Sequence, residues 1–398
     1  MRAFWFSILL FCFSLLFLSL VLWKIHPYQN ATSSLIGIWE GFAEINPNIA
    51  EPGDVIYKDG GYDGQFFYYL AKSMFADLEW DVIVDSYYFR LHRIGFTLLV
   101  GLPASIIGFS NYATIGLSIS LFLFLTSVLC LYQLLPKEHR YLTVFYLFSP
   151  YSLNSHLLLV ADGVFTSLFI ITIFLLEKQY HLIVILLVAT LTVFTRELGI
   201  ILLIPIVISK FSLKDYKFAV LYLFPILLFI SFLIWTRSFI PNHLGTNPLG
   251  FGDMIDYPLF GFVKSFFDNG IFHLSPKEST KLLLFLQASL LIAFFSNSFL
   301  NKSISIKDIF SNSKNTGILL LPILASLSIL LIAEQGYWRS FDNLSRMFTL
   351  SVPLVILLKS RVNSKLLDYF LYLSLILFFF LVLRILFITQ IKDFYISP

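Results

Sequence analysis

Asp63 occupies a glycine-flanked turn that follows the first hydrophobic segment of the chain. Glycines precede it, Gly64 follows it, and the pattern beyond predicts an aromatic-rich helix over 64–75. On one interpretation Asp63 is the N-cap of that helix and accepts hydrogen bonds from its first free N–H groups. On the other it is a general base that deprotonates a sugar hydroxyl at the membrane surface. The segment itself is compatible with both.

Three aromatic side chains close to Asp63 in sequence are candidates for stacking on a sugar ring. They are Tyr62, Phe66 and Tyr69. Flat rings suit the faces of sugars, but aromatic residues also form ordinary belts at membrane interfaces. The aromatic residues therefore support a sugar site only in combination with other residues.

Four arginines are candidates for binding the phosphate of a lipid carrier, namely Arg90, Arg93, Arg196 and Arg346. A guanidinium group matches an oxyanion such as phosphate with two parallel hydrogen bonds. The spacing of Arg90 and Arg93 places both on one face of a helix. The alternative for Arg90 and Arg93 is a contact with lipid headgroups, and for Arg346 it is snorkelling towards the interface. For Arg196 the alternative is a structural salt bridge with Glu197.

Two further carboxylates are candidates for supporting roles. Asp162 falls about two turns inside the apolar run 156–176, and an intramembrane carboxylate is costly and a functional candidate by default. Its alternative role is a hydrogen bond between packed helices. Glu197 follows Arg196 between two short apolar runs. Glu197 either forms a structural salt bridge with Arg196 that holds the turn, or orients Arg196 at the outer face.

Known cofactor and metal motifs are absent from the sequence. It contains no Walker A motif, dinucleotide fingerprint, HExxH motif or cysteine-rich metal motif, and its seven histidines lack ligand spacing. Cys12 and Cys130 lie in apolar runs and are interpreted as packing residues. We therefore predict no cofactor and assign no metal site, and metal dependence stays open.

The composition predicts an integral membrane protein. Hydrophobic residues make up 58% of the chain and charged residues 13%, and the net charge of +3 is spread over many loops, which gives no indication of nucleic-acid binding. We expect an all-α fold in a single domain over 1–398. Its apolar runs are 3–23, 94–109, 112–134, 140–151, 156–176, 180–194, 198–209, 217–236, 281–300, 316–333, 346–358 and 367–388.

The distribution of lysine and arginine predicts the orientation. Short cytoplasmic loops carry an excess of these residues, and here the excess lies at 137–140, 178, 210–217, 302–314 and 359–365. The long loops 24–93, with amphipathic helices, and 237–280 then face outward. The alternation requires 94–109 to be an in-plane or re-entrant segment. This leaves about 11 spans, with the N-terminus inside and the C-terminus outside. All the candidate site residues fall at or near the outer face.

Taken together, these features resemble the GT-C superfamily of membrane glycosyltransferases. The likeness is to the mannosyltransferase branch that acts on glycolipid anchors and to bacterial cell-surface glycopolymer formation proteins. The residues that carry it are Tyr62-Asp63-Gly64-Gln65-Phe66-Phe67-Tyr68-Tyr69-Leu70-Ala71, then Arg90 to Gly95, Ser149-Pro150-Tyr151 followed by Asp162, and Thr195-Arg196-Glu197. The likeness covers most of 1–240 and then thins to Arg346.

The resemblance implies an inverting transferase that uses a polyprenyl-phosphate sugar and a first-loop aspartate as base, the position that Asp63 inherits. The acceptor would be a cell-surface glycan, lipid or protein, and the site would face the exterior of a bacterial inner membrane. The family often has an acidic pair in this loop, whereas here a second carboxylate must come from Asp162 or Glu197. The alternatives are an O-antigen-type polymerase or ligase, and a transporter or flippase for polysaccharide or lipid-linked sugar.

Overall fold

The computed structural model describes most of the 398-residue chain. The described residues are 3–46, 48–76, 90–239, 255–268, 270–272, 276–301, 317–339, 341–388 and 391–398. Parts of the two predicted outer loops, 77–89 and 240–254 among them, and the lysine-rich connection 302–314 lie outside the described residues.

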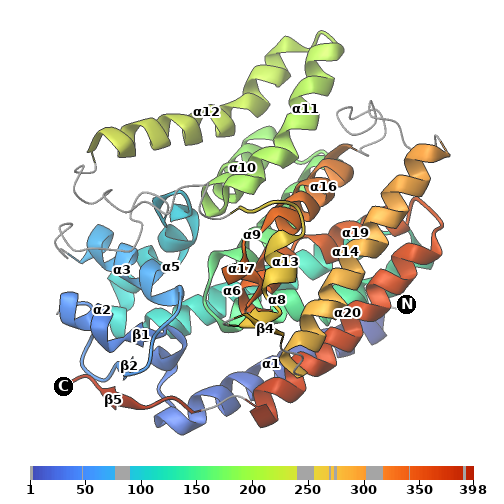
Figure 1. The fold of residues 1–398 in the computed structure, drawn as a ribbon. Helices are drawn as coiled ribbons and strands as arrows, with labels where there is room; N and C mark the ends of the chain where they lie inside the picture. The colour runs from blue at the N-terminus through green and yellow to red at the C-terminus, as the bar shows by residue number, and fades with distance from the viewer. Residues whose placement is uncertain are drawn as a thin grey trace.

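The protein is built mainly of helices, which confirms the predicted all-α class (Figure 1). The helices of the first part are α1 (Ala3–Ile25), α2 (Glu40–Ile45), α3 (Gly64–Phe75), α5 (Ile94–Ile107), α6 (Tyr112–Leu134), α7 (Thr143–Leu147), α8 (Pro150–Leu157), α9 (Ala161–Glu177), α10 (Leu182–Thr195), α11 (Ile200–Ser212) and α12 (Tyr216–Phe239). Those of the second part are α13 (Phe260–Lys264), α14 (Pro276–Leu300), α16 (Gly317–Ile332), α17 (Gln335–Trp338), α18 (Phe341–Met347), α19 (Ser351–Lys359) and α20 (Lys365–Leu383).

Within the described residues, five helical segments are long and apolar enough to cross a membrane. They are Phe4–Tyr28, Phe109–Leu134, Tyr216–Ser238, Ser279–Leu300 and Lys365–Ile388. The pair α18 and α19, bent by 44°, makes a sixth if it counts as one span. The other apolar helices are shorter than the roughly 20 residues of an upright span. The predicted number of about 11 spans is therefore not confirmed.

Several predicted apolar runs are broken into shorter helices. The run 140–151 is divided because α7 ends at Leu147 and Pro150 starts α8. Proline has no N–H to donate and suits the first position of a helix, so it starts a new helix here. The run 94–109 forms α5, a helix of 14 residues that packs on α3 and α10. These short, interrupted helices bring several helix ends into the interior of the protein.

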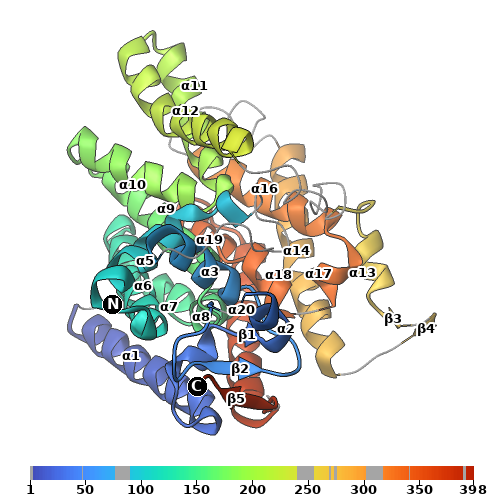
Figure 2. The same cartoon turned by 90° about the vertical axis from the view of Figure 1, so that its left-hand side faces the viewer.

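A small sheet joins the first long loop to the C-terminal tail. Strands β1 (Ile38–Trp39) and β2 (Val55–Tyr57) are parallel, and β5 (Phe394–Ile396) is antiparallel to β2 (Figure 2). A separate hairpin consists of β3 (Phe267–Asp268) and β4 (Ile271–Phe272). Because β5 pairs with β2, the tail and the first loop lie on the same side of the helices.

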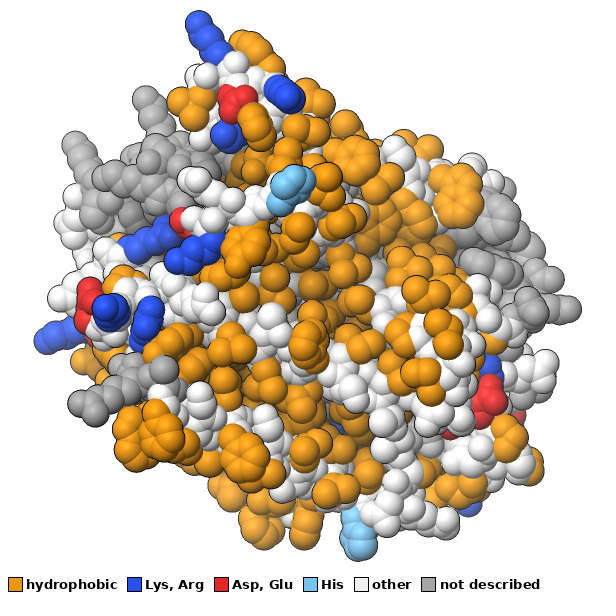
Figure 3. All heavy atoms as spheres, turned by 180° about the vertical axis from the view of Figure 1, so that it is seen from behind, with side chains coloured by type: hydrophobic (Ala, Val, Ile, Leu, Met, Phe, Trp, Pro, Cys, Tyr) orange, Lys and Arg blue, Asp and Glu red, His pale blue; other side chains and the backbone are white. Residues whose placement is uncertain are grey.

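The surface is strongly apolar, as expected of an integral membrane protein. Seen from behind, hydrophobic side chains cover the centre of the face, whereas lysines and arginines gather towards its edges (Figure 3). α1 contributes exposed Phe4, Trp5, Phe11 and Trp23. α11 and α12 extend away from the other helices in both ribbon views (Figures 1 and 2). Such helices would be unstable in water and are suited to lipid.

Candidate functional site

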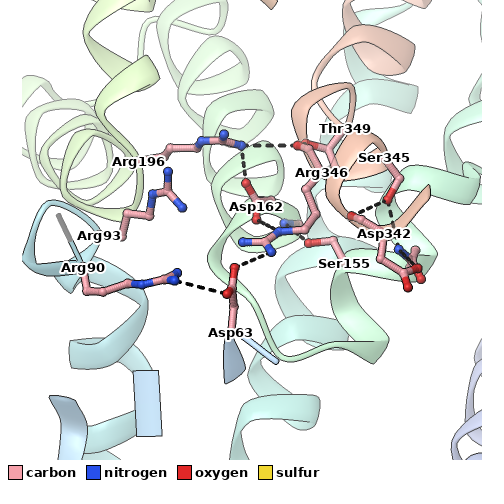
Figure 4. Close-up of polar contacts among 12 residues, drawn as sticks. Asp63, Arg90, Arg93, Ser155, Asp162, Arg196, Asp342, Ser345, Arg346 and Thr349 are labelled. Atoms are coloured by element: carbon pink, nitrogen blue, oxygen red, sulfur yellow. Dashed lines mark hydrogen bonds and ion pairs between the residues drawn. The ribbon is translucent and has the colours of Figure 1, made fainter. Parts of the chain in front are cut away.

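Asp63 lies at the start of α3, as predicted, but its side chain does not cap the helix. It makes no hydrogen bond to the first N–H groups of α3. Instead its Oδ1 accepts from Arg90 Nη2 at 3.2 Å and its Oδ2 from Arg346 Nη1 at 2.5 Å (Figure 4). The interpretation of Asp63 as a helix cap is therefore wrong, because two guanidinium groups hold the carboxylate away from the helix.

A close approach of the backbone positions Asp63 against the rest of the protein. A Cβ added to Gly64 would lie 2.5 Å from the Ile36 carbonyl oxygen and 3.3 Å from that of Leu158. Only glycine fits between these carbonyls without displacement. Gly64 therefore allows the start of α3 to pack next to the segment that leads into α9.

Asp162 lies at the beginning of a helix rather than two turns inside one. α8 ends at Leu157 and α9 starts at Ala161, with Leu159 between them at a φ of 49°. The expectation of a continuous helix through 156–176 was wrong, because Leu159, in the left-handed backbone conformation, interrupts the helix. The Asp162 carboxylate, in the first turn of α9, benefits from the free N–H groups of a helix N-terminus.

Arg346 connects the two aspartates. It lies in the last turn of α18, and while its Nη1 binds Asp63, its Nε donates to Asp162 Oδ2 at 2.8 Å (Figure 4). Arg196, directly after α10, binds Asp162 Oδ1 and also donates to the Arg346 carbonyl at 3.2 Å. One continuous chain of ion pairs therefore runs from Arg90 through Asp63, Arg346 and Asp162 to Arg196.

The remaining predicted pair lies next to this chain. Arg93 precedes α5 and its Nη2 lies 3.7 Å from Glu197 Oε1. Neither suggested role of Glu197 is observed, because no salt bridge joins Glu197 to Arg196 in the described structure. Glu197 pairs with Arg93, whereas Arg196 pairs with Asp162. Arg90 and Arg93 nevertheless project into the same region, as Figure 4 shows.

The site combines a charge excess with very unequal exposure. Four arginines face three carboxylates, and the Asp162 side chain is 2% exposed, whereas that of Asp63 is 26% exposed. Arg196 is 7% exposed, and its Nε has no hydrogen-bond partner among the described residues. A cluster with excess positive charge and a buried free donor is suited to an anionic ligand.

The charges of the arginines determine the ionisation of the acids outside the spans. Burial raises the pKa of Asp63, but the charges of Arg346 and Arg90 and their hydrogen bonds outweigh it and hold the pKa well below its usual range. Burial also raises the pKa of Glu197, but the charges of Arg93 and Arg196 outweigh this effect, so the pKa of Glu197 is lowered overall. Both acids are therefore ionised at neutral pH.

The three aromatic candidates differ in their access to a ligand. Tyr69 is 0% exposed and packs edge-on to Phe42 in the core, so the expectation that it stacks on a substrate was wrong. Tyr62 is partly buried and donates its hydroxyl to the Leu35 carbonyl, which fixes the loop before Asp63. The centre of the Phe66 ring lies 4.3 Å from Cζ of Arg90, and this cation–π contact orients the arginine beside Asp63.

Sequence reasoning missed Tyr337, in α17. The pKa of this half-buried phenol is raised, first by burial, while the charges of Arg93, Arg346, Asp63 and Arg90 also act on it. The charges of the cluster therefore act on this phenol, which makes Tyr337 a further candidate site residue. Its signal in the sequence was its position nine residues before Arg346, in the polar connection between two apolar runs.

A second polar network, also missed, lies one turn earlier along α18. Asp342, one turn before Arg346, accepts two hydrogen bonds of 2.8 Å from Arg384 and one of 3.1 Å from Asn154. Lys24, near the end of α1, donates to the Leu157 carbonyl at 3.3 Å. Arg384 lay inside the apolar run 367–388, and an arginine in such a run was a signal that could have found this network.

The described residues contain no group of three or more His, Cys, Asp or Glu side chains arranged to hold a metal ion. Comparison with known proteins adds no assignment. No protein-family model matches the chain, and neither the curated proteins nor the solved structures give a significant match.

Proposed function

We propose that the protein is an inverting glycosyltransferase that moves a sugar from a polyprenyl-phosphate donor to a glycan, lipid or protein acceptor. The observation that carries the proposal is the arrangement around Asp63. A partly exposed carboxylate lies next to a buried cluster of arginines, so one group can remove a proton while its neighbours bind a phosphate. The donor's lipid tail would lie along the apolar surface, which removes the need for a nucleotide-binding fold.

The proposed reaction assigns a separate task to each part of the site. Asp63 takes the proton from an acceptor hydroxyl, and the acceptor oxygen forms a bond to the anomeric carbon of the sugar. The bond between that carbon and the phosphate oxygen breaks, and the electron pair remains on the leaving lipid phosphate. Arg346, Arg196 and Arg90 stabilise this negative charge, with Arg93 adjacent. Attack opposite the leaving group inverts the configuration at the anomeric carbon.

The proposal includes an orientation. We place the site at the outer face of a bacterial inner membrane, with about 11 crossings and the C-terminus outside. The pairing of β5 with β2 supports the placement of the C-terminal tail and the first long loop on the same side of the membrane. Cysteine-accessibility labelling of positions 63 and 396 in intact cells tests the orientation, since both are expected to react from outside.

The reaction is tested by transfer from a labelled polyprenyl-phosphate sugar in proteoliposomes. We expect labelled product with the wild-type protein and at least about a hundredfold slower transfer with Asp63→Asn. Asp342→Asn is the matched control, because it removes the same charge one turn from Arg346 while its partner Arg384, 41% exposed, can be hydrated. Near-normal transfer by Asp63→Asn would exclude Asp63 as the base. Label that crosses the membrane without joining an acceptor would indicate a flippase instead.

A further inference from the structure

The two carboxylates bound to Arg346 differ in how easily they can leave it. Asp162 is 2% exposed, belongs to the first turn of α9, and is also held by Arg196. Asp63 is 26% exposed and stands at the end of a loop, before α3. A ligand that competes for Arg346 therefore meets one fixed carboxylate and one that is accessible from solvent.

The contacts of Asp63 are those that a phosphate group would make. Its two oxygens lie 3.2 Å from Arg90 Nη2 and 2.5 Å from Arg346 Nη1. Guanidinium groups bind carboxylate and phosphate oxygens with the same planar, charge-assisted geometry. The Asp63 carboxylate and the phosphodiester of the intact donor each carry one negative charge, whereas the lipid monophosphate that leaves carries up to two. The cluster has one more arginine than carboxylates. Phosphate oxygens can therefore take the place of the Asp63 oxygens at both guanidinium groups, and the lipid monophosphate matches the positive charge of the cluster more closely than Asp63 does.

We propose that Asp63 occupies the phosphate-binding position of its own site, and that the phosphate of the lipid-linked substrate displaces it from Arg346 and Arg90. Asp162 and Arg196 keep Arg346 in place during the exchange. The inference rests on the proposed function for the identity of the ligand, a polyprenyl phosphate, but its geometry needs only an oxyanion.

This exchange would link substrate binding to the generation of the base. While Asp63 is bound to two guanidinium groups, both of its oxygens are engaged and its affinity for a proton is low. When the phosphate takes these guanidinium groups, the carboxylate loses the contacts that stabilise its charge and becomes more basic. The base is then competent only when the donor is bound, which imposes an order on the reaction: donor first, then deprotonation of the acceptor.

The competition predicts that a variant impaired in transfer binds the lipid phosphate more tightly. The probe is a short-chain polyprenyl monophosphate without a sugar, titrated by calorimetry into the full-length protein in detergent. Asp63→Asn keeps the shape of the side chain and releases Arg346 and Arg90 from their competing anion. We expect its affinity to rise at least about tenfold over wild type, which corresponds to about 1.4 kcal/mol. Inorganic phosphate is expected to compete with the lipid.

Asp342→Asn is the matched control, because Asp342 lies on the same helix and is bound to a different arginine. Its affinity for the lipid phosphate is expected to stay within about twofold of wild type. An equal increase in both variants would show that any added positive charge suffices and would overturn the proposal. Unchanged or weaker binding by a folded Asp63→Asn, or failure of inorganic phosphate to compete, would also overturn it.

The binding result is independent of the transfer assay. Tighter binding by Asp63→Asn without sugar transfer by the wild type would support the phosphate position and contradict the glycosyltransferase. Transfer by the wild type without tighter binding by Asp63→Asn would support the glycosyltransferase and contradict the displacement of Asp63 by phosphate. Thermal unfolding of each variant in detergent establishes that the protein compared is folded.

Discussion

Replacing Asp162 by asparagine is expected to destabilise the folded protein much more than the same change at Asp63, although both side chains bind Arg346. Asp162 is almost completely buried, and its removal leaves the buried Arg196 with the Arg346 backbone carbonyl as its remaining acceptor among the described residues. Removing one member of a buried ion pair costs about 3–5 kcal/mol. The reason is that the remaining charge has lost both water and its partner.

Asp63 differs because solvent reaches it and its partners have other contacts. Its side chain is 26% exposed, and Arg346 keeps Asp162 after the substitution. Partly exposed ion pairs contribute about 1 kcal/mol or less. The difference between the two variants should therefore be about 2–4 kcal/mol in the free energy of unfolding.

The assay is equilibrium unfolding of the purified variants in mixed micelles with increasing SDS, followed by circular dichroism. Adding Arg196→Gln to Asp162→Asn should recover part of the loss, since it removes the uncompensated charge. The reasoning is refuted if Asp63→Asn is destabilised as much as Asp162→Asn, or if the double variant loses the full sum of the single losses.

Three other changes test separate parts of the structure. Arg90→Gln removes one of the charges that lower the pKa of Asp63, so the acid side of the pH profile of kcat/KM should move to higher pH; an unmoved profile would disconnect Arg90 from the base. Gly64→Ala places a Cβ 2.5 Å from the Ile36 carbonyl and should cost about 1–3 kcal/mol of stability, measured by the same SDS titration. Deleting 392–398 removes β5, and the segment 48–60 should then be cleaved faster in limited proteolysis, whereas an unchanged rate would show that the pairing contributes little.

Local patterns in the sequence predicted individual helices well. The helix expected over 64–75 is α3, and the run 112–134 coincides with α6. In both, apolar and aromatic residues predominate, and a polar residue marks the start, namely Asp63 before α3 and Asn111 before α6. Hydrophobic pattern and boundary residues are local, so they can be recognised without knowledge of the fold.

The interruption between α8 and α9 could not be found in the same way. Residues 157–160 read Leu-Leu-Leu-Val, which contains no proline, glycine or polar turn residue. Leu159 adopts a φ of 49°, which a leucine disfavours locally, so the conformation is not encoded in the residues around it. The break changes the place of Asp162 from about two turns inside a span to the first turn of a helix.

The pairing of the charged residues was beyond sequence reasoning for a different reason. Asp63 and Arg346 are 283 positions apart, and nothing in their neighbourhoods indicates which arginine meets which carboxylate. Charge type and the expected side of the membrane selected the candidates, and seven of them lie in one cluster: Asp63, Arg90, Arg93, Asp162, Arg196, Glu197 and Arg346. The pair of Asp342 and Arg384 was not predicted, because Arg384 lies within the apolar run 367–388 and Asp342 is far from it in sequence.

The positions of these charges at helix ends explain how the cluster can exist in a weakly polar interior and still exchange partners. Asp63 stands at the start of α3 and Asp162 in the first turn of α9, whereas Arg196 follows α10. Acids near N-termini and bases near C-termini are each stabilised by about 0.3–1 kcal/mol, and by up to about 2 kcal/mol when partly buried. Asp63 makes no hydrogen bond to α3 in this structure, but once it leaves its arginines its carboxylate is free to accept from the first N–H groups of that helix, and it stays in the favourable field of the helix N-terminus. That residual stabilisation is what would make the displacement of Asp63 by a phosphate feasible, whereas the same displacement at Asp162, buried and held by two arginines, would not be.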